Sequence, residues 1–243
     1  MSLEVLRDKS EIAYARLELS RRGLSCTSSL WQRILRKLGV AKGIEVGDKV
    51  KSWDVLKTAN FIEKNIPKDA PILDIGAYAS EILCVLHRLG YSRLTGVDLD
   101  PRLKLMPYAG TIHYEVSDFM HTAFKNESFE VITATSVIEH GFNSQSLLKE
   151  MSRLLRPGGY FVASFDYWPE KVDTSGIPFF GMDWRIFSEQ EVLQFLAEAR
   201  VHNLIPCGQL VLNAQGTAIN YAGRSYTFAW LAVRKSELQK KIV

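Results

Sequence analysis

Residues 71–100 read PILDIGAYASEILCVLHRLGYSRLTGVDLD, and this stretch decides how the chain folds. A short apolar run at its start ends in Asp74 and Gly76, and a second apolar run ends in Asp98. Residues 81–89, which lie between the two runs, have apolar side chains at helical spacing and are followed by a glycine, as helices often are. The order strand, helix, strand predicts a βαβ unit with two parallel strands.

The same alternation continues along the chain. We predict three further strands, at residues 111–116, 129–137 and 160–165. We also expect helices with one apolar face after the last two of these strands, and a capping box at residues 188–191 opens the later helix. Two apolar runs, at residues 209–212 and 226–233, predict the last strands. This alternation predicts an α/β fold, a doubly wound sheet with helices on both faces.

The first seventy residues predict helices rather than strands. We expect one helix over residues 30–38 and another that opens at Ser52 and ends near Pro67. The chain is therefore divided into an N-terminal helical cap region, residues 1–50, and an α/β domain, residues 51–243. Residues 1–70 carry 14 Lys and Arg against 9 Asp and Glu, an excess that we assign to solvated helix faces.

Composition excludes several classes of protein. Of the 243 residues, 47% are apolar and 23% are charged, which is typical of a globular protein. No stretch approaches the ~20 apolar residues that span a bilayer, and the first ten residues lack the apolar core of a signal peptide. The three cysteines, Cys26, Cys84 and Cys207, show neither metal-binding nor redox spacing. We therefore predict a cytoplasmic protein with no metal and no membrane partner.

Candidate binding residues follow the predicted strands. Ligands of an open α/β sheet bind beyond the carboxyl ends of its parallel strands. Asp98 ends the second strand, where one carboxylate could accept from both hydroxyls of a ribose. Gly76 would let the backbone approach a ligand closely. Asp118 and Phe119 offer an acceptor for an exocyclic amine beside a flat apolar surface. The pattern predicts an adenosine site; the alternative is that these acids only cap helices and turns.

Five segments, in unbroken order, resemble the motifs of the class I S-adenosylmethionine (SAM) dependent methyltransferases. The resemblance covers roughly residues 50 to 200, and five ordered elements are far more specific than one glycine motif. The segments are residues 73–76 (LDIG), 96–101 (GVDLDP), 117–119 (SDF), 129–132 with 136–140 (FEVI and SVIEH), and 154–160 (LLRPGGY).

This resemblance implies a fold, a cofactor and a set of residues. It implies a Rossmann-like seven-stranded sheet whose last strand is antiparallel, with residues 51–243 as the methyltransferase domain and SAM as the cofactor. Asp98 would bind the ribose, Asp118 and Phe119 the adenine, and Asp74 and Gly76 the methionine side, with Ser136 near the methionine and the acceptor. The predicted cofactor-binding residues are Asp74, Gly76, Ala77, Tyr78, Asp98, Leu99, Asp118, Phe119 and Ser136.

The first motif departs from the family pattern at Tyr78 and Ser80, where glycines are usual. Tyrosine resists the positive φ angles that glycine adopts freely, so we expect strain in this loop. Either Tyr78 shapes a variant loop and touches the cofactor or the acceptor, or SAM binding is impaired. We favour the first interpretation because the later motifs are intact.

His140 is the predicted catalytic residue. SAM carries an activated methyl group, so the protein mainly has to hold the acceptor in line and exclude water. A hydroxyl acceptor must also lose a proton, and histidine is the usual base. His140 follows the fourth strand, and Asp166 or Tyr167 is the alternative base. The long connection after the fifth strand carries aromatic residues, which favours a lid over a sugar or natural-product acceptor.

Methylation of a small-molecule hydroxyl leads and N-methylation follows, and three other functions compete with them. The first is a catalytically silent SAM- or nucleotide-binding domain, which the Tyr78 substitution would favour. The second is a methyltransferase acting on RNA, although the chain has no base-amine motif and no appended nucleic-acid module. The third is a nicotinamide-dependent oxidoreductase, which needs a GxGxxG pattern that residues 76–81 lack. The sequence makes no prediction of oligomeric state.

Overall fold

The computed structural model describes residues 2–27, 44–179 and 181–237. The predicted helix over residues 30–38 lies outside them. The chain divides into two compact units, Asp8–Phe119 and a second formed by Met1–Arg7 with Met120–Val243. They are called here the first unit and the second unit.

Three parallel strands form the sheet of the first unit. They are β2 (Ile72–Ile75), β3 (Leu94–Asp98) and β4 (His113–Val116), with β3 in the middle. Helix α4 (Ile82–Arg88) connects β2 to β3 and is buried along most of its length. The predicted βαβ unit is therefore confirmed, and all three strands end at the same edge of the sheet, as parallel pairing requires.

Two helices and two 3-10 turns make up the rest of the first unit. Asp8 caps α1 (Lys9–Arg21) by accepting from the Ser10 amide. A 3-10 turn, η1 (Lys49–Lys51), leads into α3 (Ser52–Asn65), which packs against α1 and begins at the predicted Ser52. A second 3-10 turn, η2 (Pro101–Leu105), is capped by Asp100. The structure therefore bears out the predicted helix start at Ser52.

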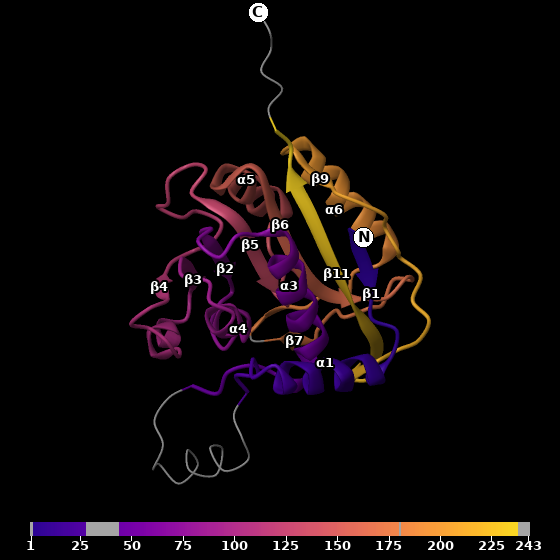
Figure 1. The fold of residues 1–243 in the computed structure, drawn as a ribbon. Helices are drawn as coiled ribbons and strands as arrows, with labels where there is room; N and C mark the ends of the chain where they lie inside the picture. Colours follow the sequence, from indigo (N-terminus) through magenta and orange to yellow (C-terminus); the bar gives the residue numbers. More distant parts are fainter. Residues whose placement is uncertain (1, 28–43, 180, 238–243) are drawn as a thin grey trace, which may run out of the picture. The chain divides into compact units, whose positions relative to one another are not determined.

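The sheet of the second unit contains the predicted antiparallel strand. Strand β5 (Phe129–Thr135) runs parallel to β6 (Leu155–Tyr167), and β11 (Arg224–Lys235) runs antiparallel beside β6 (Figure 1). The other edge of β11 pairs with β1 (Leu3–Val5) and β9 (Leu204–Pro206). The fold class is therefore confirmed as α/β, with mostly parallel main strands and a last strand that inserts antiparallel between two others.

One predicted strand is wrong. Residues 209–212 do not form a strand, and Leu210 makes only an isolated bridge to Leu3. The run lies along β1, where the Leu3 amide donates to the Gln209 carbonyl and the Val211 amide to the Leu3 carbonyl. Three short strands that the sequence did not indicate, β1, β9 and β10 (Ile219–Tyr221), pair with β11, so the expectation of helices rather than strands over residues 1–70 is wrong at residues 3–5.

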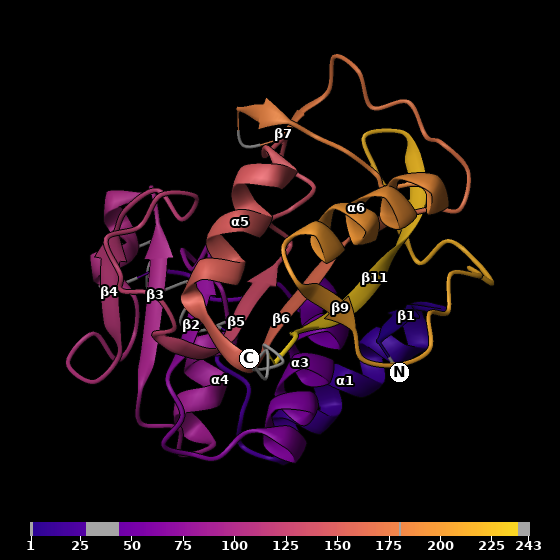
Figure 2. The same cartoon turned by 90° about the horizontal axis from the view of Figure 1, so that it is seen from above.

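Two helices and a small hairpin complete the second unit. Helices α5 (Ser144–Leu154) and α6 (Glu189–Val201) pack against each other (Figure 2). The predicted capping box is present, since the Ser188 and Glu191 side chains each accept from the backbone of the other. Strands β7 (Pro178–Phe179) and β8 (Met182–Asp183) form the hairpin between β6 and α6. Within the described ranges, no helix has the length and apolar character to cross a membrane.

Candidate active site

The loop between β2 and α4 carries its strain on an alanine rather than on the tyrosine. Gly76 has a φ of 66° and Ala79 a φ of 59°, whereas neither Tyr78 nor Ser80 adopts a positive φ. The expected strain is therefore present in the loop, but it falls on Ala79 and not on Tyr78. A left-handed alanine costs roughly 1–2 kcal/mol, less than a bulky residue would need to turn the chain at this point. The loop keeps its turn without a second glycine.

Backbone contacts bring the first two motifs together. The Ala77 amide donates to the Val97 carbonyl at 3.1 Å, and the Tyr78 amide donates to Asp98 Oδ2 at 3.0 Å. Asp74 and Ala77 are fully buried, so these two residues of the first motif lie in the interior of the first unit. The Tyr78 ring lies against the Arg102 guanidinium, 4.6 Å from the ring centre, and is therefore held at η2 by a cation–π contact.

Asp98 uses its carboxylate to organise the loops at the end of β3. Its Oδ1 accepts from the Asp100 amide at 2.9 Å, in addition to the Tyr78 contact on Oδ2. Turn capping, the alternative raised from the sequence, is therefore one role of Asp98. Each carboxylate oxygen accepts about two hydrogen bonds, so both retain capacity for the hydroxyls of a ribose. The residue fits the ribose-binding position of a SAM site.

The residues expected around the adenine lie at the ends of β3 and β4. The Ser117 amide donates to the Asp98 carbonyl at 3.0 Å, which joins the third motif to the second. Leu99 is 62% exposed and presents an open apolar surface, Asp118 is half-buried, and Phe119 is 4% exposed. This arrangement combines an acceptor and apolar side chains as an adenine site requires, while the individual contacts stay predictions.

A glycine in β3 sets how closely α4 approaches the sheet. A Cβ at Gly96 would lie 2.8 Å from Leu83 Cδ1 of α4 and 2.8 Å from a Tyr114 ring carbon. Any larger residue would push the helix or the neighbouring strand away. Because α4 continues directly from the first-motif loop, Gly96 helps to set the position of that loop.

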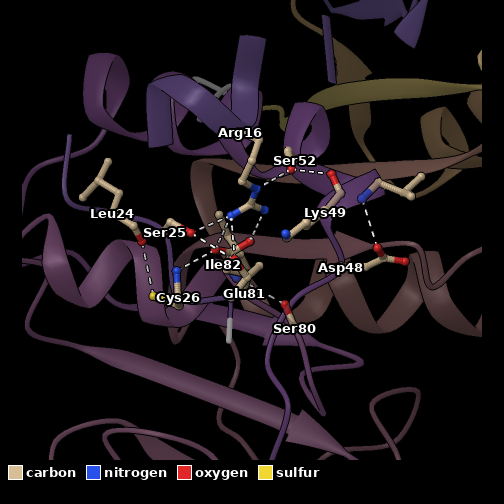
Figure 3. A network of polar contacts seen from close by, with 12 residues as sticks. Arg16, Leu24, Ser25, Cys26, Asp48, Lys49, Ser52, Ser80, Glu81 and Ile82 are labelled. Carbon is tan, nitrogen blue, oxygen red and sulfur yellow. Dashed lines mark hydrogen bonds and ion pairs between the residues drawn. The ribbon is translucent and has the colours of Figure 1, made fainter. Parts of the chain in front are cut away.

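A buried ion pair at the start of α4 was missed by the sequence analysis (Figure 3). The Arg16 guanidinium donates to both Glu81 oxygens, at 3.1 and 2.8 Å, and the Cys26 amide donates to Glu81 Oε1 at 2.7 Å. The Glu81 side chain is fully buried. The pair joins α1 and residues 25–27 to the loop that precedes α4. No local pattern could reveal it, because the two charges are 65 residues apart.

In the second unit, Ser136 lies at the carboxyl end of β5 in a strained conformation. Its φ is 54°, and its amide donates to the Ser164 carbonyl on β6 at 2.9 Å. Its buried hydroxyl has no hydrogen-bond partner among the residues that the structure describes. Non-glycine residues with positive φ cluster at functional sites, and a buried hydroxyl needs a partner. Both properties fit a residue that contacts a ligand.

The predicted base, His140, and Glu139 follow the carboxyl end of β5, and Asp166 is the second-last residue of β6. His140 is 7% exposed, Glu139 1% and Asp166 5%. The His140 amide donates to the Val137 carbonyl at 3.2 Å, so residues 137–140 form a turn directly after the strand. Tyr167, an alternative base, donates its hydroxyl to the Leu212 carbonyl at 2.6 Å. Burial raises the pKa of Tyr167, which makes it a poor base at neutral pH.

Aromatic side chains surround Asp166. The Trp184 indole donates to Asp166 Oδ2 at 2.8 Å, and its ring makes an edge contact with Tyr226, with ring centres 5.6 Å apart. Burial raises the pKa of Tyr226, and the negative charges of Asp166 and Glu139 raise it further. The phenol therefore stays neutral. The connection after β6, expected to form a lid, is thus attached to the strand ends through Trp184, which is 4% exposed.

A cavity of about 370 Å³ in the second unit lies away from these residues. Glu127, Arg153 and Lys235 are among its lining residues, and the Lys235 ammonium donates to the carbonyl of Leu155, the first residue of β6. The cavity therefore lies at the amino ends of β5 and β6. Ligands of parallel strands bind at the opposite ends, so this cavity is not assigned to the methyl acceptor.

Parallel strands with acidic and glycine residues at their carboxyl ends, followed by an inserted antiparallel strand, define the class I methyltransferase fold. Residues 73–163 match the family model described as "Methyltransferase domain". Residues 73–163 thus carry a SAM-dependent methyltransferase domain, and SAM is the cofactor. The nicotinamide-dependent and catalytically silent alternatives are thereby set aside.

Solved structures share the fold at low sequence identity. Geranyl diphosphate C-methyltransferase from Streptomyces coelicolor, in complex with S-adenosyl-L-homocysteine, is 17% identical with a TM-score of 0.58, covering 86% of this chain and 99% of that chain. A putative sarcosine dimethylglycine methyltransferase from Galdieria sulphuraria is 14% identical with a TM-score of 0.54, covering 85% and 98%. At such identities the similarity shows a shared fold only. It does not show which acceptor this chain methylates.

Curated relatives have a protein acceptor in their name. EEF1A lysine methyltransferase 2 of Mus musculus is 25% identical over 198 residues, which covers 72% of this chain and 78% of that protein. The Homo sapiens protein is 25% identical over 147 residues. That match covers 52% of this chain and 62% of the human protein, less than two thirds of its length. These relatives do not support the small-molecule hydroxyl expected from the sequence.

Proposed function

We propose that this methyltransferase transfers the methyl group of SAM to a hydroxyl of a small molecule of the sugar or natural-product type, with His140 as the general base. The observation that carries the proposal is the burial of His140 and two carboxylates at the ends of β5 and β6. A base that is 7% exposed suits an acceptor small enough to enter beside it. The connection anchored by Trp184 would exclude water during transfer.

The proposed cofactor contacts follow from the carboxyl ends of the strands. Asp98 would accept from the ribose hydroxyls, and Asp74, Gly76, Ala77 and Tyr78 would line the methionine side. Leu99, Asp118 and Phe119 would surround the adenine, and the Ser136 hydroxyl would lie near the methionine moiety. Support comes from the buried hydroxyl of Ser136, the remaining acceptor capacity of Asp98 and the open side chain of Leu99.

Bound SAM supplies a methyl group on a positively charged sulfur, which is activated for displacement. The role of His140 is to accept the hydroxyl proton as the oxygen–carbon bond forms and the sulfur–carbon bond breaks. The imidazole then carries the proton until it passes to solvent. Only a neutral imidazole can serve, because imidazolium has no lone pair for the proton. Glu139, the neighbour of His140, would orient the imidazole or the acceptor.

A second candidate is N-methylation of a lysine side chain, which the curated relatives favour. A lysine acceptor must lose its proton before attack, and two buried carboxylates near the site would attract the ammonium form. His140 would then matter less if the amine arrives neutral.

The division into residues 1–50, an N-terminal helical cap region, and residues 51–243, the methyltransferase domain, is also proposed. Helix α1 supports it, whereas β1 belongs to the sheet. The protein would work in a reducing cytoplasm, which the free state of Cys26, Cys84 and Cys207 supports.

Methyl transfer from labelled SAM to separate acceptor pools tests the proposal. The pools are small hydroxyl compounds including sugars, small amines, purified elongation factor 1A and RNA. We expect label in the hydroxyl pool, with loss of roughly 10²-fold in turnover for the His140→Ala variant. Label confined to the protein pool would establish the lysine candidate instead, and label confined to RNA would overturn both.

A further inference from the structure

Residues 183–185, in the connection after β6, contact the turn that carries His140. The Arg185 amide donates to the Glu139 carbonyl at 2.9 Å. A Cβ at Gly141 would lie only 3.2 Å from Asp183 Cβ, and Gly141 has a φ of 71°. Residues 183–185 therefore contact the turn on both sides of His140, at Glu139 and at Gly141.

Trp184, at the centre of this segment, is fixed from the other side. Its indole N–H donates to Asp166 Oδ2 at 2.8 Å, and both residues are at most 5% exposed. Its ring makes edge contacts with Tyr221 and Tyr226, each with ring centres 5.6 Å apart. A buried hydrogen bond to a carboxylate is stronger than a neutral one, and the aromatic contacts limit rotation of the indole.

Backbone bonds keep the rest of this region in register with β6. The Phe187 amide donates to the Asp166 carbonyl at 2.9 Å, and the Trp168 amide donates to the Phe187 carbonyl at 3.0 Å. The Thr174 hydroxyl donates to the Trp184 carbonyl at 2.5 Å. The side chain and the backbone of Asp166 therefore both bind the segment that leads from Trp184 to Phe187. Displacement of Trp184 would move residues 183–185 and hence the His140 turn.

We propose that Asp166 and Trp184 are positioning residues that clamp residues 183–185 onto the His140 turn and so hold His140 in place for methyl transfer. The proposal rests on the proposed function, in which His140 is the base. Asp166 acts through Trp184 and need not touch the acceptor. Catalytic groups depend on accurate placement, since a misplacement of about 1 Å can cost on the order of 10²-fold in rate.

The sharpest test is Trp184→Phe, which keeps an aromatic ring and removes the N–H donor to Asp166. We expect kcat to fall about ten- to a hundredfold while the KM for SAM changes less than about twofold, because the cofactor contacts are unaffected. Asp166→Asn, which retains an acceptor oxygen for the indole, should keep most of the activity, and Asp166→Leu should behave like Trp184→Phe. Trp53→Phe, on α3 of the first unit, is the matched control and should resemble wild type.

Nuclear magnetic resonance of ¹⁵N-labelled histidine separates this proposal from the proposed function. The His140 signal is assigned by its loss in His140→Ala. We expect Trp184→Phe to shift or broaden the His140 signal and leave the other histidine signals in place. An unchanged His140 signal with unchanged kcat in Trp184→Phe would overturn the clamp. A shifted signal together with a fully active His140→Ala would support the clamp and refute His140 as the base.

Discussion

Replacing Arg16 by leucine would leave a buried negative charge without its partner. In the folded protein Glu81 accepts two hydrogen bonds from Arg16, at 3.1 and 2.8 Å, and one from the Cys26 amide at 2.7 Å. The Glu81 side chain is fully buried, and that of Arg16 is 16% exposed (Figure 3). In Arg16→Leu the carboxylate would keep only the amide donor, while water could not reach it without opening the structure.

The size of the effect follows from this burial. Removing one partner of a buried ion pair costs about 3–5 kcal/mol, because the remaining charge stays desolvated. For a chain of this length, 1 kcal/mol lowers Tm by about 2–4 °C, so the expected loss is roughly 6–20 °C. Urea denaturation and thermal unfolding followed by circular dichroism would measure the two quantities independently.

Two variants make the experiment decisive. Arg21→Leu, on the same helix, breaks a pair with Glu18 in which Arg21 is 72% exposed, and it should leave Tm unchanged within error. Adding Glu81→Gln to Arg16→Leu removes the stranded charge and keeps an acceptor for the Cys26 amide, so the double variant should be more stable than Arg16→Leu. The reasoning is refuted if Arg16→Leu unfolds like Arg21→Leu, or if the double variant is no more stable than the single one.

Three further predictions concern the cofactor, the base and the sheet. Asp98→Ala should weaken SAM binding by about 1–3 kcal/mol in calorimetry, and unchanged affinity in a folded variant would remove Asp98 from the ribose site. His140→Ala should lower turnover of a hydroxyl acceptor by roughly 10²-fold with SAM affinity intact; a full-rate variant would point to another base, such as Asp166. Gly96→Ala should destabilise the protein by about 1–3 kcal/mol in urea, because its Cβ would lie 2.8 Å from Leu83. Gly110→Ala, where no atom lies within 4 Å, is the control, and equal stability of the two variants would contradict the close-packing argument.

Features that depend on neighbouring residues could be read from the sequence. The βαβ unit of residues 71–100, the start of α3 at Ser52 and the capping box at Ser188 all follow from side-chain periodicity or from groups within a few residues. The ordered motifs also indicated the antiparallel insertion of β11, because the resemblance carried the topology with it.

The sequence predicted individual residues of the candidate site but not how they are arranged in space. Sequence reasoning named Asp98, Ser136 and His140, since each lies at or just after the carboxyl end of a predicted strand. It misplaced the strain of the first-motif loop on Tyr78, because φ depends on how the whole loop closes and the turn falls on Ala79. It also predicted a strand at residues 209–212, since an apolar run does not reveal that it will make only an isolated bridge to the neighbouring segment.

By itself, the sequence determined the order of the five main strands from β2 to β6, the helices α4, α5 and α6, the capping box at Ser188 and the residues at the strand ends. Only the tertiary structure decided which distant groups meet: Arg16 with Glu81, and Trp184 with Asp166. The physical reason is that periodicity and capping are set by interactions over a few residues. A buried charge or donor, by contrast, finds its partner only where the folded chain brings it, and many side chains of suitable chemistry could fill that place.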